Sequence, residues 1–175
     1  MTVPVIETAR LILRGHKLDD FESVASMWAD PGVTRFIGGR TSTREESWAR
    51  LMRYAGHWAL LGYGYWAVEV KGEGRHIGDV GFADWKREIT PSLDGMPESG
   101  WAFVPAVHGR GVATEAVAAA LAWGDLHFGP KTTTCIIGPD NTASIRVAEK
   151  CGYREFYRGD FKGAPTVQFR RGASD

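Results

Sequence analysis

The chain has 175 residues, of which 43% are hydrophobic and 24% are charged, and these values predict one folded domain over residues 1–175 rather than a disordered chain. At this length folding buries enough surface for a core and a binding cleft without disulfide bonds or structural metals. The 21 basic and 21 acidic residues balance, which argues against a nucleic-acid-binding protein because such proteins usually carry a basic excess.

The N-terminal half of the chain alternates between helical and strand patterns. In two segments apolar residues recur at the spacing of a helix that buries one face. The turn Asp30-Pro31-Gly32 ends the first helix, and Gly62 ends the second. The predicted elements are a strand over 10–14, helices over 18–28 and 42–61, and a hairpin of strands over 65–70 and 76–84. We expect the second helix to bury Trp48, Leu51, Met52, Ala55, Trp58 and Ala59.

The C-terminal half begins with a long loop over residues 85–97, which is a candidate substrate-binding segment because loops of this length are uncommon in compact domains. The strand after it ends before Pro105, since proline cannot donate a hydrogen bond to a sheet. The predicted elements are a strand over 98–104, a helix over 109–128, a strand over 132–137, a helix over 141–151, and strands over 153–157 and 166–170. This order predicts an α/β fold in which helices cover a mixed sheet.

Membrane and disulfide-rich proteins are excluded by the absence of their signals. The longest strictly apolar run, residues 116–123, is far shorter than the roughly 20 residues of a membrane-spanning helix. The N-terminus has no apolar signal core, so we expect a cytoplasmic protein that does not bind membranes. Cys135 and Cys151 form no CxxC pair, so we expect two reduced, partly buried thiols.

A glycine-rich turn between a strand and a long helix is the most informative segment. Gly109 and Gly111 precede the helix, whose first N–H groups lack partners and carry the positive end of the helix dipole. Because glycines let an anion approach the backbone, the junction predicts a phosphate site, to which Arg110 adds charge. The Walker pattern does not fit, because it requires Lys-Ser/Thr where Val112-Ala113 stands. The GxGxxG fingerprint does not fit either, because Thr114 stands at the position of its last glycine. A tight turn without a ligand is the alternative.

The same segment resembles the Gln/Arg-x-x-Gly-x-Gly/Ala motif of the GNAT family of N-acetyltransferases. Here it reads His108-Gly109-Arg110-Gly111-Val112-Ala113, with His108 in place of Gln or Arg. A second match is similar to the branch that acetylates the N-termini of ribosomal proteins, and it consists of Asn141, Ser144, Lys150, Gly152 and Tyr153. Weaker matches are Thr8-Ala9-Arg10-Leu11 and Gly62-Tyr63-Gly64-Tyr65-Trp66. The resemblance extends from Glu7 to Phe169.

This resemblance implies an α/β (α+β) fold with a mixed, mostly antiparallel sheet flanked by helices. It also implies transfer of an acetyl group from acetyl-CoA to a primary amine, which attacks the thioester directly in a ternary complex. The residues that it implies for coenzyme binding are Phe103, Val104, Gly109, Arg110, Gly111, Val112, Ala113, Thr114 and Asn141. Core packing is an alternative role for Phe103 and Val104, and helix capping is one for Asn141.

Two residues are implied for catalysis. The resemblance implies that Ser144, one helical turn after Asn141, donates a proton to the departing CoA thiolate or only hydrogen-bonds its sulfur. Glu98 opens the strand that carries the thioester site and is the candidate base, because an amine with a pKa of about 8–10 is mostly protonated at neutral pH. Asp84 and Asp79 are alternative bases, and a solvated surface charge is the alternative reading of Glu98.

The acceptor and the histidines are less constrained. The acceptor is either a protein N-terminus or a small molecule such as a polyamine, an amino sugar or an amino-acid analogue. His16, His57 and His76 are scattered along the chain without metal-ligand spacing, so we expect no metal.

A homodimer and a monomer are both compatible with the sequence. The alternative functions are a non-catalytic acyl-CoA-binding module of the same fold and a generic anion-binding domain.

Overall fold

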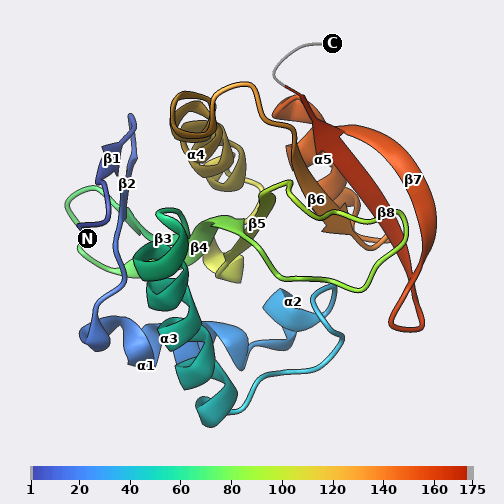
Figure 1. Ribbon diagram of the computed structural model, residues 1–175. Coiled ribbons are helices and arrows are strands. Elements are labelled where there is room, and N and C mark those ends of the chain that lie inside the picture. The colour runs from blue at the N-terminus through green and yellow to red at the C-terminus, as the bar shows by residue number, and fades with distance from the viewer. Residues whose placement is uncertain (1, 173–175) are drawn as a thin grey trace.

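The computed structural model describes residues 2–172, which form one eight-stranded sheet with helices on its faces (Figure 1). The strand order is β1-β2-β3-β4-β5-β6-β8-β7, and each neighbouring pair is antiparallel except β5 with β6. The strands are β1 (Ile6–Glu7), β2 (Leu11–Arg14), β3 (Tyr65–Val70), β4 (His76–Ala83), β5 (Glu98–Phe103), β6 (Thr133–Ile137), β7 (Arg154–Phe161) and β8 (Ala164–Arg171). The expected fold class is therefore confirmed.

The helices lie on opposite faces of this sheet. They are α1 (Phe21–Trp28), α2 (Pro31–Thr34), α3 (Arg44–Leu61), α4 (Val112–Phe128) and α5 (Thr142–Lys150), with 3₁₀ turns η1 (Leu18–Asp20) and η2 (Pro105–Val107). Trp28 of α1 bonds to Asp79 of β4, whereas Gly124 of α4 packs against Phe82 of the same strand. Because successive strand residues alternate between faces, α1 and α4 cover opposite sides of β4. Within the described residues, no helix is both long and apolar enough to span a bilayer.

Two apolar clusters attach the helices to the sheet. The larger one lies under α4, where Ala116, Val117 and Leu121 pack with Trp66 and Phe82. The smaller one joins the α1–α3 layer to β5 and comprises Val24, Met27, Trp28, Val33, Leu51 and Ala102, with Phe21 and Val104 at its edge. This second cluster matters for the site because it holds three helices over the end of one strand.

Helix α3 begins and ends close to the predicted positions. Thr43 Oγ1 accepts a hydrogen bond from Glu46 N at 3.1 Å, and the Glu46 carboxylate accepts one from Thr43 N at 2.8 Å, which is a capping box. At the other end Gly62 adopts a φ of 75°, the left-handed conformation that commonly ends helices.

The predicted buried stripe of α3 is only partly correct. Leu51 and Trp58 are buried, but the other four members, Trp48, Met52, Ala55 and Ala59, are exposed. The helix instead buries Tyr54, whose ring stacks on Tyr65 at 4.7 Å and lies 4.9 Å from the His16 ring. Apolar spacing missed this face because its central residue is a tyrosine that packs among polar rings.

Other differences concern short elements. Asp30-Pro31-Gly32 ends α1 but also begins α2, because the Asp30 carboxylate accepts from Gly32 N at 2.7 Å and Pro31 fits the first helical position. Strand β1 was not predicted, since its two residues are too few to show alternation. Strands β7 and β8 are longer than predicted, because they pair with each other from Arg154–Arg170 to Phe161–Ala164.

Gly81 and Gly56 provide a matched test of this packing. A Cβ on Gly81 of β4 would overlap Gly64 O and Tyr65 Cα of the neighbouring strand, whereas a Cβ on Gly56 of α3 would meet nothing within 4 Å. We expect Gly81→Ala to lower the free energy of unfolding by about 3 kcal/mol or more. Gly56→Ala should raise it by about 0.5–1 kcal/mol. Urea denaturation measures both, and a neutral Gly81→Ala variant would contradict the close approach of β3 and β4.

Candidate active site

Strands β5 and β6 run parallel but pair only where both begin. In the described part of the chain their one ladder pair is Glu98 with Thr134, next to which Thr134 N donates to Pro97 O at 3.1 Å. On its other edge β5 stays paired with β4 as far as Phe103. The sheet therefore opens between β5 and β6 toward the carboxyl ends of both strands, and this side of β5 has no partner strand there.

The hydrogen bonds of β5 decide which of its amides face this opening. Val104 N donates to Ile77 O at 3.0 Å, so the main-chain groups of Val104, and of every second residue before it, are directed toward β4. The N–H and C=O groups of Phe103 consequently point toward β6. Of the two residues expected to offer an amide to a ligand, Phe103 directs its amide into the opening, whereas Val104 uses its amide inside the sheet.

The glycine-rich turn lies at the open end, between η2 and α4. Gly109 and Gly111 have φ values of 71° and 75°, which disfavour residues with a side chain. Gly111 is the N-cap of α4 and supplies no capping side chain, so the N–H groups of Val112, Ala113 and Thr114 have no partner within the helix. With the exposed Arg110 beside them, these donors lie at the position where the sequence predicts an anion site.

The N-terminal segment of the chain clamps this turn. Glu115, in the first turn of α4, accepts hydrogen bonds from Thr8 Oγ1 at 2.6 Å, from Arg10 N at 3.0 Å and from Arg10 Nε at 2.6 Å. Arg10 Nη1 also donates to Arg110 O at 2.9 Å. Burial opposes the charge of Glu115, but these bonds outweigh it and hold the pKa of Glu115 below its ordinary value. The weak Thr8-Ala9-Arg10-Leu11 match thus corresponds to a support for the turn.

His108 ties the same turn to β5. Its Nε2 lies 2.9 Å from Phe103 O, and because a carbonyl only accepts, Nε2 carries the hydrogen. The imidazole therefore occupies one side of the carbonyl that points into the opening. This contact gives a structural role to the residue that departs from the Gln/Arg pattern.

Helix α5 begins at the same edge of the sheet as α4, because each helix follows one of the two parallel strands. Asn141 is its N-cap, and Asn141 Oδ1 accepts from Ser144 N at 3.2 Å, so the capping role is present. The C-terminal end of α5 meets the first turn of α4, where the Cys151 thiol lies 3.8 Å from Thr114 O. Asn141 and Ser144, at the start of α5, follow the carboxyl end of β6, and the predicted anion site follows the carboxyl end of the parallel strand β5.

Glu98 lies at the opposite, closed end of the opening, about 17 Å along β5 from Phe103 at ~3.3 Å per residue. It is buried, and Arg87 donates to both carboxylate oxygens, from Nε at 2.6 Å and from Nη2 at 2.7 Å. A pocket lined in part by Asp84, Arg87 and Glu98 adjoins it. Asp84, an alternative base, pairs with Lys86 at 2.7 Å. The loop over 85–97 therefore supplies a cation that the sequence did not assign to the site.

Comparison with known proteins identifies the family of the chain. Residues 10–154 match the family model of the acetyltransferase (GNAT) domain. The chain belongs to the GNAT acetyltransferase family. The uncharacterized N-acetyltransferase YnaD of Bacillus subtilis (strain 168) is 29% identical over 157 residues, which cover 90% of this chain and 85% of that protein.

Solved GNAT structures share the whole fold. A protein of Bordetella pertussis assigned to the GnaT-family acetyltransferases has a TM-score of 0.84 and 30% identity, with 97% of this chain and 99% of that chain covered. RimL, a ribosomal L7/L12 alpha-N-protein acetyltransferase in complex with coenzyme A, has a TM-score of 0.75 at 14% identity, with 97% and 98% covered. The structural neighbours of this GNAT chain thus include ribosomal-protein acetyltransferases.

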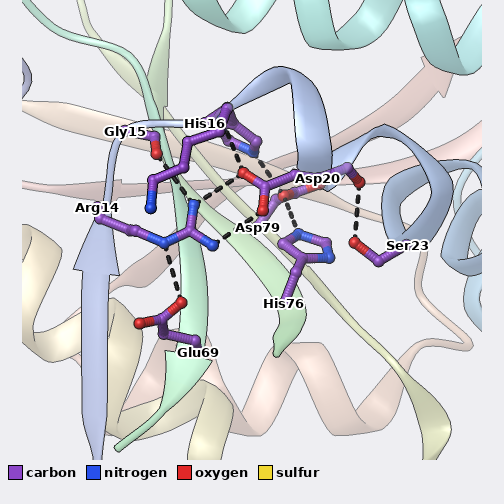
Figure 2. A network of polar contacts seen from close by, with 9 residues as sticks. Arg14, Gly15, His16, Asp20, Ser23, Glu69, His76 and Asp79 are labelled. Atoms are coloured by element: carbon purple, nitrogen blue, oxygen red, sulfur yellow. Dashed lines mark hydrogen bonds and ion pairs between the residues drawn. The ribbon is translucent and has the colours of Figure 1, made fainter. Parts of the chain in front are cut away.

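Asp79, the other alternative base, is sealed inside a network between β4 and α1 (Figure 2). The Nε2 atoms of His16 and His76 each lie 2.8 Å from Asp79 Oδ1, and Trp28 Nε1 donates to Oδ2 at 3.4 Å. Asp79 has no exposed surface. Burial alone would raise the pKa of Asp79, but the two histidines hold it far below its ordinary value. A carboxylate so enclosed cannot collect a proton from a substrate.

The expectation that the histidines are scattered is wrong for two of them. His16 and His76 meet at Asp79, where the three donor atoms lie within 4.8 Å of one another. Figure 2 shows that the neighbouring Arg14 joins Asp20 and Glu69, at 2.8 Å and 2.9 Å. Sequence spacing could not reveal this grouping, because His16 follows one strand and His76 begins another that pairs two positions away in the sheet.

The network predicts a pH-dependent stability. Burial opposes a charge on His76, but Asp79 outweighs it and raises the pKa of His76 above 6.5. A raised folded-state pKa stabilises the protein below pH ~6.5, and this contribution is lost as the pH rises through the folded-state value. The loss of unfolding free energy caused by His76→Gln should therefore be larger at about pH 5.5 than at about pH 9. Denaturant unfolding at the two pH values measures this loss of unfolding free energy. His127→Gln is the control, because the His127 ring stacks on Trp123, away from Asp79.

A second prediction concerns the anion site. Gly111→Ala should cost about 1–2 kcal/mol of stability, because alanine is strained at a φ of 75°, and should weaken coenzyme A binding about 10-fold by displacing the turn. Gly163→Ala, at a φ of 78° in the β7–β8 hairpin, carries the same strain and should leave binding unchanged. Calorimetric titration of both variants with coenzyme A measures the two affinities. Equal affinities of Gly111→Ala and Gly163→Ala would argue against the turn as the binding site.

Proposed function

We propose that this protein transfers an acetyl group from acetyl-CoA to a primary amine by direct attack in a ternary complex. The observation that carries the proposal is the opening between β5 and β6, which ends at the uncapped N-terminus of α4. The opening offers strand amides to an extended arm, and the helix offers N–H groups to a diphosphate. Both features fit acetyl-CoA, which supplies the acyl group as a thioester.

The coenzyme is held by main-chain donors in this proposal. The N–H groups of Gly109, Gly111, Ala113 and Thr114 bind the pyrophosphate, with Arg110 adding charge. The Phe103 amide faces the pantetheine arm and the thioester carbonyl, where a fixed donor stabilises developing negative charge. Val104 packs beside this arm through its half-buried side chain. Because the clamp at Glu115 fixes the turn before binding, little ordering is needed.

Proton transfers are assigned to residues at the two ends of the opening. Ser144, in the first turn of α5, hydrogen-bonds or protonates the departing sulfur, and Asn141 holds that turn through its cap and presents its amide nitrogen to the pantetheine. Glu98 takes the proton of the amine through relayed water, because about 17 Å of β5 separates it from the Phe103 amide at ~3.3 Å per residue. Arg87 occupies one side of each Glu98 oxygen, and a carboxylate has about four lone-pair sites, so two are left for this role.

The acceptor is either a protein N-terminus or a small amine. RimL, a neighbour in structure, is named for acetylating a ribosomal protein, which supports the first class. We place the protein in the cytoplasm, as a monomer or homodimer that binds neither nucleic acid nor membrane and needs no metal. One observation favours a non-catalytic acyl-CoA-binding module instead: the candidate base is already paired with Arg87.

Release of free thiol from acetyl-CoA, measured across a panel of amines, separates these functions. An acetyltransferase releases thiol only with an acceptor, whereas a binding module gives heat on titration with acetyl-CoA and no thiol. A protein that gives no heat with either acetyl-CoA or coenzyme A would refute both.

The same assay tests Glu98. Glu98→Gln should lower turnover more at low pH than at high pH, because the amine loses its proton unaided as the pH rises. Arg87→Gln is the matched control, since it breaks the same ion pair but leaves the carboxylate. If both variants reduce turnover equally at every pH, Glu98 is a structural partner of Arg87 and not the base.

A further inference from the structure

Arg50 is a half-buried cation on α3, the helix that covers the face of the sheet opposite α4. Its guanidinium carbon lies 3.6 Å from the centre of the Trp28 ring. Arg50 Nη1 donates one hydrogen bond, to Ser42 Oγ at 3.2 Å. A guanidinium has five N–H donors in a planar fork, so most of its donors are not used by these contacts.

In the described part of the chain, no carboxylate oxygen lies within 4.0 Å of the Arg50 guanidinium. Glu46, one turn earlier, is bound by Arg40 and by Thr43 N. Asp79 is held by Trp28 and the two histidines. Arg50 is half-buried and lies against the Trp28 ring, so water reaches only part of its guanidinium, and this burial lowers the pKa of Arg50.

A poorly solvated cation without a counterion is unfavourable unless a ligand supplies the charge. Arg53, one turn later, makes a useful contrast, because it also lies over an indole, that of Trp85 at 4.9 Å, but is exposed to water. Water satisfies Arg53 without cost. Arg50 is thus the arginine of α3 for which a bound anion would bring a gain.

The position of Arg50 connects it with the proposed chemistry. Trp28, on which it lies, packs in one cluster with Ala102 and Val104, the residues on either side of Phe103 in β5. The sheet also holds Trp28 in place, because Trp28 Nε1 donates to Asp79 of β4. Asp79 pairs in register with Ala102 of β5. Through Trp28, the guanidinium thus belongs to the α1–α3 layer that covers the end of β5 next to Phe103.

We propose that Arg50 binds the carboxylate of the acceptor, so that the acceptor is a small amine that also carries a carboxylate, as amino acids do. This inference rests on the proposed acetyl transfer. The planar fork of Arg50 matches a carboxylate in two parallel hydrogen bonds, and the Trp28 ring holds that plane in place. A protein N-terminus offers an amide next to its amine instead of a carboxylate, so this subsite selects against it.

The test compares amino acids with their own carboxamides, which differ only in the charge that Arg50 would bind. The proteinogenic amino acids and these carboxamides are assayed for thiol release from acetyl-CoA, and each is titrated calorimetrically into the protein saturated with coenzyme A. The variants are Arg50→Gln, Arg50→Lys and, as a control, Arg44→Gln, which removes a surface arginine of α3 that pairs with Glu22.

We expect wild-type protein to prefer one or more amino acids over the matching carboxamides. Arg50→Gln should raise KM and Kd for those amino acids about 10-fold to 100-fold, the range of a lost hydrogen-bonded ion pair, and leave the values for carboxamides unchanged. Arg50→Lys, which keeps the charge but not the fork, should cause a smaller rise, and Arg44→Gln none. If Arg50→Gln does not fold, the split between amino acid and carboxamide in Arg50→Lys decides.

Equal effects of Arg50→Gln on both members of each pair would overturn the proposal, as would the absence of binding by every amino acid. Failure of the proposed function looks different. Amino acids would then bind through Arg50 to the coenzyme-saturated protein, while no thiol is released from acetyl-CoA.

Discussion

One missing set of strand hydrogen bonds is the feature on which the proposed coenzyme binding depends. β5 and β6 pair at Glu98–Thr134 and then separate, so the Phe103 main chain faces space where a sheet would normally have a neighbour. Unpaired main-chain groups inside a protein are costly, and His108 satisfies only the Phe103 carbonyl. In the proposed function, an extended ligand pairs with the remaining groups and completes the sheet. The glycine-rich turn at the open end adds helix N–H groups for the charged part of such a ligand.

The opposite face of the sheet depends on a buried charge. Asp79 is fully enclosed, and its bonds to His16, His76 and Trp28 join the loop after β2, the start of β4 and helix α1. Removing one partner from such a group leaves an unpaired buried charge, which costs more than the pair itself contributes. The network is therefore better suited to fixing the α1–α3 layer than to exchanging protons, although a carboxylate beside histidines first suggests catalysis.

Local patterns predicted the elements well and their contacts poorly. The capping box at Thr43 and the glycines at 109 and 111 are short-range signals, and the structure has the expected helix ends at both places. Arg87 at Glu98 and His16 at Asp79 are contacts between residues 11 and 63 positions apart, created by the strand order. The buried face of α3 was missed for the same reason. Tyr54 is buried by contacts with His16 and Tyr65, which are distant in the sequence, and its own hydrophobicity does not indicate this burial.

The two proposed anion sites, the glycine-rich turn for the diphosphate and Arg50 for the acceptor carboxylate, recognise their ligands in different ways. A diphosphate is recognised by its charge and extent, which main-chain amides and a helix dipole supply without any particular side chain, so His108 can replace Gln or Arg in the motif. An acceptor must be told apart from other amines, and that requires a side chain whose desolvation makes the wrong ligand unfavourable. Arg50 meets this condition because Trp28 covers one face of its guanidinium and because an uncharged acceptor would leave its donors unsatisfied. On this reasoning the binding of the coenzyme follows from the fold, whereas the choice of acceptor follows from the residues that cover the α1–α3 face.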